Sequence, residues 1–420
     1  MQDKGKVGMF KSKMIIGILL GSLFLPGASV PAQEARDLES RVACLEKSLS
    51  LMNLGDGLSL GAHATMIIQG TSNANASGIT VSNNSYKGDD STDSGYSVDL
   101  ELEKHFPDIQ STAFLHIETG EGAGVTDNLE LFSNVNCDND DSNGLLAVTE
   151  LFWQQNFNDA FTLTFGKIDS AGFIDTNEYA NYECKQFLSN IFCNSSVIEF
   201  PDSSIGLGLN IPFCQTLEFD LVMAEGNADY AQVGDHPWIG LQLKLKPEFL
   251  RRPGNYRLLY WYNDAPHSSW IDGLKTKEKA SGFGVSIDQE ICNNLCVFLR
   301  AGWQDDQVFL DSAADGITSE DFSLAAAYSV GFQLSGAAWK RADDTCGIAY
   351  GMIEPSDDYK QAQVRQGKTE SHAELYYNIV VNKNLRITPD AQIINNPFGK
   401  DAPNGTSTIL VAGLRIQIDF

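Results

Sequence analysis

TILVAGLRIQIDF, residues 408–420, decides the fold, because its side chains alternate between two faces with period two. Successive side chains of a β-strand point to opposite faces, so every second residue lies on the same face. One face is entirely apolar: Leu410, Ala412, Leu414, Ile416, Ile418 and Phe420. The other face combines small and polar side chains: Val411, Gly413, Arg415, Gln417 and Asp419. One face suits hydrocarbon and the other tolerates water, which predicts the wall of a membrane-spanning β-barrel.

The same alternation recurs along the chain and predicts sixteen strands. Charged residues stay on one face, as in Asp99 and Glu101 between Val98, Leu100 and Leu102. We expect strands at 59–69, 95–104, 110–119, 147–157, 160–168, 204–211, 216–225, 237–246, 255–263, 280–289, 295–304, 321–333, 345–353, 372–381, 385–394 and 408–420. An even number of strands places both ends of the barrel segment on the same side of the membrane.

The connections between these strands alternate in length. The long ones are rich in Gly, Asn, Asp and Ser and cover 70–94, 120–146, 169–203, 226–236, 264–279, 305–320, 354–371 and 395–407. The intervening connections are mostly short, and long external loops with short periplasmic turns are typical of outer-membrane barrels. A soluble β-sandwich would not sort its loops by length. We therefore expect an all-β protein, a 16-stranded antiparallel transmembrane β-barrel over residues 57–420.

Two segments precede the expected barrel. Residues 1–32 combine early lysines, an apolar run at 14–25 and small residues before Gln33, which predicts a cleaved signal peptide. The apolar run is too short to span a bilayer. Residues 33–54 carry apolar side chains at heptad spacing, which predicts a short coiled-coil-like periplasmic helix with an unassigned partner.

Charge and cysteine content limit the partners. The chain has 29 Lys+Arg against 55 Asp+Glu, a formal net charge of −26, which argues against nucleic acid because phosphate binding needs clustered basic residues. Eight cysteines in an exported chain permit disulfides, and two pairs are close in sequence: Cys184 with Cys193, and Cys292 with Cys296. Partly free thiols are the alternative. No C-x-x-C pair or His-rich tract indicates a metal, and we expect no cofactor.

The third long connection, 169–203, differs from a solvated loop in its apolar content. Phe173, Tyr179, Phe187, Phe192 and Phe200 alternate with acidic and amide side chains. So much apolar surface needs a surface to bury against. A barrel of this size encloses a channel, so we expect the segment to fold inward against the inner wall and narrow it.

Several motifs resemble the carbohydrate-selective porin family (OprB-type). They include Gly166-Lys-Ile-Asp169, Gln186-Phe-Leu188, Glu374 with Tyr376-Tyr377, Thr388-Pro-Asp390, and Gly413, Arg415 and Phe420 at the end. The resemblance extends over roughly residues 57–420. It implies a sixteen-stranded outer-membrane barrel that passes sugars by diffusion, with an inward loop shaping the constriction. The cysteines, the heptad helix and the acidic balance depart from that family pattern.

Strand parity and the third loop give the candidate functional residues. Sugars are bound by aromatic faces and by carboxylate, amide or guanidinium groups that hold paired hydroxyls. The candidates for solute contact are Glu118, Arg300, Glu374, Tyr376, Arg415, Asp175, Asn177, Glu178 and Tyr179. For each of them, an ion pair with an opposite charge on the wall across the lumen is an equally valid interpretation. We expect Lys167 and Asp169 to anchor the loop, and Arg341 with Asp344 to form a structural ion pair.

Three function classes follow from these observations. The leading one is an outer-membrane porin for passive, carbohydrate-preferring diffusion, with membrane lipid around it and sugars as permeants. The alternative is a general cation-preferring diffusion porin, suggested by the net charge, which could also be a disulfide-linked structural envelope protein. An enzyme is not expected, because the six histidines lie in no G-x-S-x-G or H-E-x-x-H context. A homotrimer is left open.

Overall fold

The computed structural model of the chain describes residues 52–55, 57–75, 90–138, 144–158, 160–310, 322–401 and 406–420. The expected signal peptide and residues 33–51 of the expected helix lie outside these residues. The end of that expected helix is a strand instead, because β1 (Met52–Gly55) pairs antiparallel with β2 (Leu58–Ser72). β1 pairs with residues 58–60 of β2, beyond the point where the last strand of the chain ends, so it uses backbone groups that this strand leaves available.

Sixteen long strands form one closed antiparallel barrel, as the sequence predicts. The short strands β1, β10 (Glu248–Phe249) and β14 (Val308–Leu310) join the same sheet. Besides β2, the long strands are β3 (Thr92–Phe106), β4 (Ser111–Glu121), β5 (Ala147–Phe157), β6 (Phe161–Ile168), β7 (Ser204–Cys214), β8 (Leu217–Glu225), β9 (Pro237–Leu245), β11 (Arg252–Ser269), β12 (Glu278–Cys292), β13 (Leu295–Gln304), β15 (Leu324–Ser335), β16 (Thr345–Pro355), β17 (Glu370–Asn382), β18 (Leu385–Asn395) and β19 (Thr408–Asp419).

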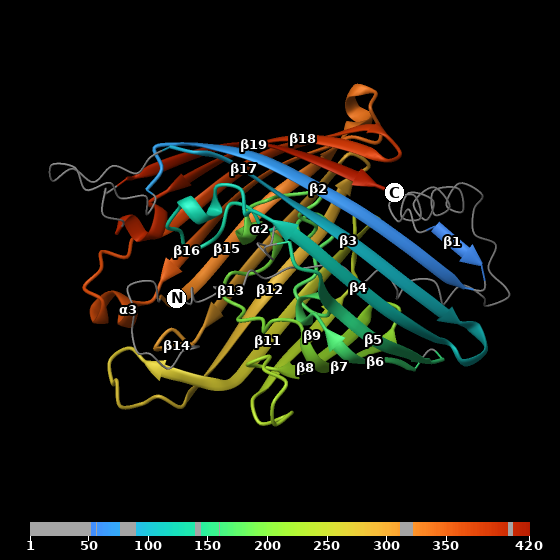
Figure 1. Ribbon diagram of the computed structural model, residues 1–420, viewed down its shortest axis with the longest axis horizontal. Coiled ribbons are helices and arrows are strands. Elements are labelled where there is room, and N and C mark those ends of the chain that lie inside the picture. The colour runs from blue at the N-terminus through green and yellow to red at the C-terminus, as the bar shows by residue number, and fades with distance from the viewer. Residues whose placement is uncertain are drawn as a thin grey trace.

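The barrel closes where β19 pairs with β2, and Figure 1 shows these two strands side by side. The pairing is antiparallel, with Leu414 opposite Ile68. Phe420 N donates to the Ala62 carbonyl at 3.0 Å, so the last residue belongs to this seam. With the seam formed, neither strand is left as an open edge, and every long strand is hydrogen-bonded on both sides.

The two faces of the wall have opposite character. Along β19, Arg415 and Gln417 are buried on the inner face, while Leu414 and Ile418 are exposed on the outer face. Apolar side chains are also exposed on the other strands, among them Met66, Leu100, Leu151, Phe165, Leu207, Met223, Leu258, Phe283, Leu299, Val330, Ile348, Leu375 and Ile393. This outer surface suits hydrocarbon, and the inner wall carries the polar residues.

The connections contain only short helices within the described residues. These are η1 (Pro107–Ile109), η2 (Thr126–Asn128), η3 (Ser170–Gly172), α2 (Asn190–Cys193), η4 (Gly336–Trp339), α3 (Asp357–Ala362) and η5 (Pro397–Lys400). None of the described helices is long and apolar enough to cross a membrane. In the turn after β15, Arg341 Nη2 donates to Asp344 Oδ1 at 3.0 Å, which confirms the expected structural ion pair.

Candidate functional site

The third long loop, residues 169–203, leaves the barrel at the end of β6 and returns at β7. Asp169 caps its first turn, because the Asp169 carboxylate accepts a hydrogen bond from Ala171 N at 3.0 Å. Its own backbone N–H donates to Glu150 Oε1 on β5 at 3.4 Å. Lys167, the other expected anchor, lies elsewhere: its ammonium is 5.5 Å from the ring centroid of Tyr230, in the connection after β8.

Arg300 on β13 and Asp175 in the loop form a buried ion pair. Arg300 Nε lies 3.0 Å from Asp175 Oδ1, and the two side chains are 2% and 0% exposed. The same guanidinium donates to four further acceptors on the loop: the carbonyls of Asp175 (2.9 Å), Ala180 (2.6 Å) and Phe192 (2.8 Å), and Asn181 Oδ1 (3.1 Å). Strand parity gave Arg300, and the third loop gave Asp175, as candidates for solute contact, with an ion pair as the alternative. In the structure they hold the loop to the wall instead.

Glu374 on β17 and Arg415 on β19 hold the middle of the same loop. The Glu374 carboxylate accepts hydrogen bonds from the backbone N–H groups of Leu188 (2.6 Å) and Ser189 (2.9 Å). Arg415 donates to the Gln186 carbonyl at 2.9 Å. Both charged side chains are at most 1% exposed, so these two candidates also hold the loop against the wall.

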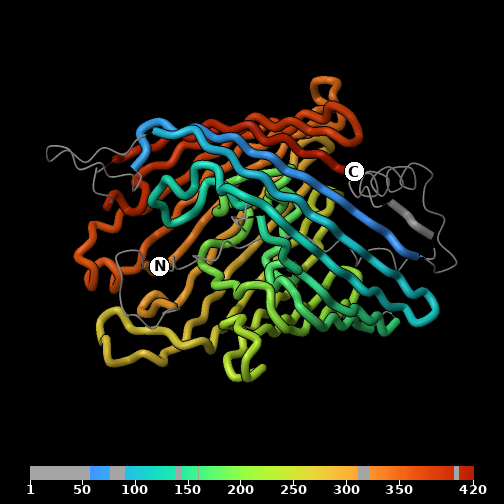
Figure 2. Tube along the Cα trace, in the orientation of Figure 1, coloured from blue at the N-terminus to red at the C-terminus, as the bar shows by residue number. Residues whose placement is uncertain are grey.

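Aromatic packing continues the loop–wall contact. Phe187 of the loop meets Tyr376 of β17 edge-on, with ring centroids 4.9 Å apart, and lies 5.6 Å from the ring of Phe298 on β13. Ile191 and Phe192 of α2 join the same buried cluster. Tyr376, predicted to contact solute, is 1% exposed and forms part of this apolar contact. Figure 2 shows the green trace of the third loop inside the barrel.

Five buried glycines on the inner wall make room for the loop. A Cβ atom at any of them would lie within 3.0 Å of a loop side chain, closer than carbon atoms pack. The pairs are Gly208 with Phe173, Gly240 with Ile174, Gly302 with Val197, Gly347 with Phe187, and Gly351 with Ile191. The contact between loop and wall therefore depends on glycines, which leave space for the loop, as well as on charged side chains.

The Gly208→Ala variant tests this fit. The added methyl group would overlap the Phe173 ring, and overpacking of this kind costs about 1–3 kcal/mol. We expect a lower melting temperature and a more variable single-channel conductance. Gly70→Ala is the control, because a Cβ there meets its nearest atom, Thr92 Oγ1, at 3.4 Å. Equal melting temperatures for the two variants would contradict the proposed fit.

The second long connection also folds against the inner wall, which the sequence analysis did not anticipate. Glu370 on β17 accepts hydrogen bonds from Phe132 N at 3.1 Å and Ser133 N at 3.2 Å. Gln392 on β18 donates to the Val135 carbonyl at 2.8 Å. Residues 122–138, named the second loop here, therefore share the interior with the third loop.

Only a weak sequence signal marks this second loop. Four apolar residues occur within seven positions of an otherwise polar stretch: Leu129, Leu131, Phe132 and Val135. The partner residues Glu370 and Gln392 lie on inner-face positions of their strands, but nothing in the sequence connects them with residues more than two hundred positions earlier.

The tip of the third loop rests on the wall at β12. Asn177 Nδ2 donates to Ser286 Oγ and to the Ile287 carbonyl, both at 3.3 Å. The backbone N–H of Glu178 donates to Asp288 Oδ2 at 3.4 Å. Asn177 is 2% exposed, whereas Glu178 is exposed, so only Glu178 of these two expected solute contacts presents its side chain to the solvent.

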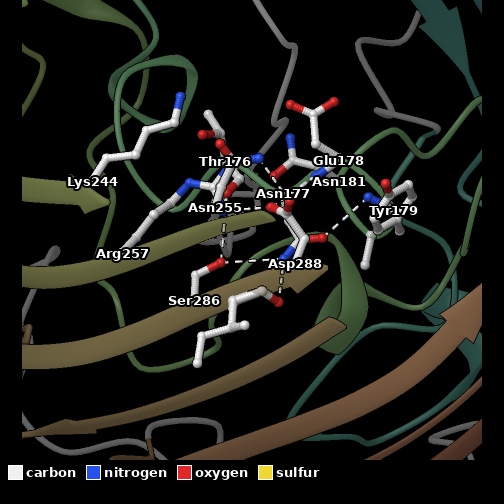
Figure 3. Close-up of polar contacts among 12 residues, drawn as sticks. Thr176, Asn177, Glu178, Tyr179, Asn181, Lys244, Asn255, Arg257, Ser286 and Asp288 are labelled. Carbon is white, nitrogen blue, oxygen red and sulfur yellow. Dashed lines mark hydrogen bonds and ion pairs between the residues drawn. The ribbon is translucent and has the colours of Figure 1, made fainter. Parts of the chain in front are cut away.

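Asp288 joins this tip to basic and amide groups of the wall. Arg257 Nη1 lies 2.6 Å from one carboxylate oxygen, and Asn255 Nδ2 donates to the other at 2.7 Å. Figure 3 shows the Glu178 carboxylate and the Lys244 ammonium on the same side of this contact, both pointing away from Asp288. Lys244 itself pairs with Glu218 Oε2 on the neighbouring strand at 3.4 Å. The tip is thus surrounded by positively charged, negatively charged and amide side chains.

Two tyrosines and a lysine extend the solvent-facing side of the loop. Tyr179 is half-buried, and burial, together with the neighbouring Cys296, raises the pKa of the Tyr179 phenol. The Lys185 ammonium lies 5.0 Å from the ring centroid of Tyr182 and 3.8 Å from Asp419 Oδ2. Burial lowers the pKa of Lys185, and the Asp419 carboxylate opposes that effect.

Glu118, the remaining candidate, lies apart from the third loop. It is buried on β4 and belongs with Asp99 and His116 to a group whose ligand-type atoms lie within 4.8 Å of one another. Asp138, Glu183 and Cys184 form a second such group in the described part of the chain. Hydrogen bonds link two members of each group, with His116 Nε2 3.0 Å from Asp99 and Cys184 Sγ 2.9 Å from Asp138.

The cysteine pairs expected from sequence proximity are not formed. Cys137, Cys184, Cys193, Cys292 and Cys296 are not disulfide-bonded in this structure. Cys184 donates to Asp138, whereas the Cys193 thiol lies 3.4 Å from the Phe187 carbonyl. In the β12–β13 turn, the register places Cys292 opposite Leu295 and Cys296 opposite Glu290, so the second pair is out of register.

Comparisons with known proteins agree with this architecture. The family described as "Carbohydrate-selective porin, OprB family" matches residues 50–420. Porin B of Pseudomonas aeruginosa is 23% identical over 316 residues, which are 64% of this chain and 66% of the relative. An uncharacterized protein of Aquifex aeolicus is 24% identical over 231 residues, 55% of this chain and 58% of the relative. The matches thus span 58% and 66% of the lengths of these relatives.

Solved structures show the same fold. The high-pH structure of Pseudomonas putida OprB covers 91% of this chain and 96% of its own, with a TM-score of 0.70 and 18% identity. The outer membrane channel DcaP of Acinetobacter baumannii covers 89% of this chain and 100% of its own, with a TM-score of 0.53 and 12% identity.

Proposed function

The chain belongs to the carbohydrate-selective porin family, OprB, and from this membership we propose that it is a passive channel that prefers carbohydrates. The family and the closed sixteen-stranded barrel make it an outer-membrane porin. The carbohydrate preference is the further step. It is supported by the family description and by the side chains that the inward loop presents.

One observation carries the preference: the third loop is fixed to the wall and presents hydrogen-bonding and aromatic groups together at its tip. Glu178 is exposed, and Tyr179 and Tyr182 are half-buried beside it. A carboxylate can hold paired sugar hydroxyls, and aromatic rings pack against sugar C–H surfaces. Lys244 and Asn255 of the wall supply further donors near the same tip. A sugar passing the tip could exchange hydrogen bonds with water for hydrogen bonds with these groups.

Reconstitution into liposomes tests the proposal. Swelling rates would be compared for glucose, maltose and a non-sugar polyol of similar size. We expect the sugars to permeate faster than the polyol, and maltose to lower the ion current in planar bilayers. Equal rates for sugar and polyol, without any reduction of current, would show a porin that lacks the preference.

A cation-preferring general porin is the second candidate, favoured by the formal net charge of −26. Reversal potentials in asymmetric KCl would distinguish it from a sugar-preferring channel of weak ion selectivity. A strong potassium preference combined with equal sugar and polyol rates would support this second candidate.

The Glu178→Lys variant is predicted to shift ion selectivity toward anions. Glu178 is exposed at the tip, and a charge that acts over a few ångströms through water is worth about 1 kcal/mol, roughly fivefold in relative permeability. The measurement is the reversal potential in asymmetric KCl. Glu178→Gln should give an intermediate value, and the same exchange at exposed Glu354 on β16 should give no change. An unchanged potential in Glu178→Lys would place the ion path away from the tip.

The proposal also covers the signal peptide, the lipid around the barrel and the oligomeric state. We propose that residues 1–32 are removed as a signal peptide, which N-terminal sequencing of the protein from outer membranes would test. Lipid is expected around the exposed apolar belt of the barrel. A homotrimer is a further proposal, tested by native mass measurement in detergent.

A further inference from the structure

The second and third loops contact each other directly through their backbones. Asn190 N donates to the Asn134 carbonyl, and Cys137 N donates to the Leu188 carbonyl, both at 2.9 Å. These two bonds bring Cys137 of the second loop against the segment that leads into α2, which ends at Cys193. Two successive long loops, separated by β5 and β6, therefore form one body inside the barrel.

The two cysteines meet at this contact. Cys137 is 3% exposed and Cys193 is 2% exposed. Cys193 is a neighbour of the Cys137 thiol and contributes to raising its pKa. The Cys193 thiol also lies 3.4 Å from the Phe187 carbonyl, in the same segment whose Leu188 carbonyl binds Cys137 N. Residues 187–188 thus contact both cysteines, which lie next to this one buried segment of the third loop.

Cys184 serves as an internal comparison. It lies on the third loop and is equally buried, but its thiol donates to Asp138 Oδ1 at 2.9 Å. Sequence proximity favours Cys184 as the partner of Cys193. The fold instead gives Cys193 a partner 56 positions earlier in the chain.

Cys137 and Cys193 are both thiols in this structure. We propose that in the exported protein they form a disulfide that fastens the second loop to the third. An outer-membrane protein crosses an oxidising compartment, where exposed thiols are converted to disulfides. Each thiol loses one proton and one electron, and the S–S bond forms as an oxidised dithiol enzyme of that compartment is reduced to its two thiols. The mixed disulfide with that enzyme forms before the loops close.

Burial gives this order of events a physical reason. Burial raises the pKa of the Cys137 thiol well above its usual range, so little thiolate is present once the loops are packed. Thiolate is the species that attacks a disulfide. The bond therefore forms while the chain is open and is then protected from exchange by the surrounding loops.

The bond can be detected by digestion, because lysines separate the three cysteines. Trypsin would place Cys137 on peptide 105–167, Cys184 on 168–185, and Cys193 together with Cys214 on 186–244. In protein extracted from outer membranes and alkylated without reduction, we expect peptide 105–167 linked to peptide 186–244. A second cleavage after Glu199 would separate Cys193 from Cys214 and assign the bond. Alkylated Cys137 and Cys193 in the unreduced protein would overturn the proposal, as would a linked peptide 168–185.

A functional measurement adds a second test, which rests on the proposed channel function. Current recordings of the C137S/C193S variant are expected to show more frequent changes between conductance levels than the parent, because the two loops are then held only by non-covalent contacts. C184S is the matched control, and it should keep the parent's noise. Identical noise in all three proteins would mean that the bond does not restrict the loops, while the peptide result would still decide whether it forms. Failure of sugar permeation alone would affect the proposed function and leave the disulfide assignment intact.

Discussion

Arg300→Ala is expected to release the third loop from the barrel wall and to raise the single-channel conductance severalfold. The substitution removes the ion pair with Asp175 and four further hydrogen bonds to the loop. It also leaves the Asp175 carboxylate buried without its cation, and breaking a buried pair from one side costs about 3–5 kcal/mol. Loss of this contact removes the main charged attachment between β13 and the loop.

Planar-bilayer recording measures the effect, and limited proteolysis of the loop gives an independent readout. Lys279→Ala is the control, because Lys279 also pairs with a carboxylate, that of Asp264, but is 53% exposed, where ion pairs contribute little. Arg300→Lys should keep the charge and lose most of the hydrogen bonds, so its conductance should be intermediate. A parent-like conductance and protease resistance in Arg300→Ala would show that the apolar contacts alone fix the loop.

Glu370→Ala is the second substitution with a large expected effect, and it acts on the second loop. The Glu370 carboxylate accepts hydrogen bonds from the backbone of Phe132, Ser133 and Phe398 and lies 2.9 Å from His372 Nε2. Removing the acceptor leaves buried N–H groups unsatisfied, each at a cost of about 1–3 kcal/mol. We expect the second loop to detach from β17. We also expect the connection between β18 and β19, which contains Phe398, to become less firmly held.

Cleavage after Glu130 by a glutamyl endopeptidase reports detachment of the second loop, because this bond lies two residues from Phe132. Glu354→Ala removes an exposed carboxylate from β16 and serves as the control. Glu370→Gln keeps one acceptor oxygen and should be cleaved at an intermediate rate. Cleavage of Glu370→Ala at the parent rate would show that Gln392 and the packing of Phe132 suffice to hold the loop.

The barrel could be predicted from the sequence because its rule is local. Side chains that alternate with period two between lipid and lumen identify a strand without reference to any other strand. Each expected strand is present, and Arg415 and Leu414 lie on the faces that parity assigned to them. Residues 52–54 show the limit of local patterns, since heptad spacing predicted a helix where pairing with β2 forms a strand.

The site could be predicted only in part, because its contacts are not local. Parity placed Arg300, Glu374 and Arg415 inside the barrel, but it could not identify what fills the interior. Arg300 binds a carboxylate 125 positions away, and Glu374 binds backbone more than 180 positions away. The cysteines illustrate the same limit, since proximity in sequence indicated Cys184 for Cys193 whereas the folded loops bring Cys137 to it.

The wall glycines imply that the third loop and the wall positions it packs against form one unit, although they are separated along the chain. Each of Gly208, Gly240, Gly302, Gly347 and Gly351 lies against side chains of the third loop, although the wall positions are spread over four strands, β7, β9, β13 and β16. A third loop grafted alone from a related porin would meet methyl or larger groups wherever the recipient lacks glycine. We therefore expect loop exchange to succeed only when the wall positions are exchanged with it, and these pairs to change together among related sequences.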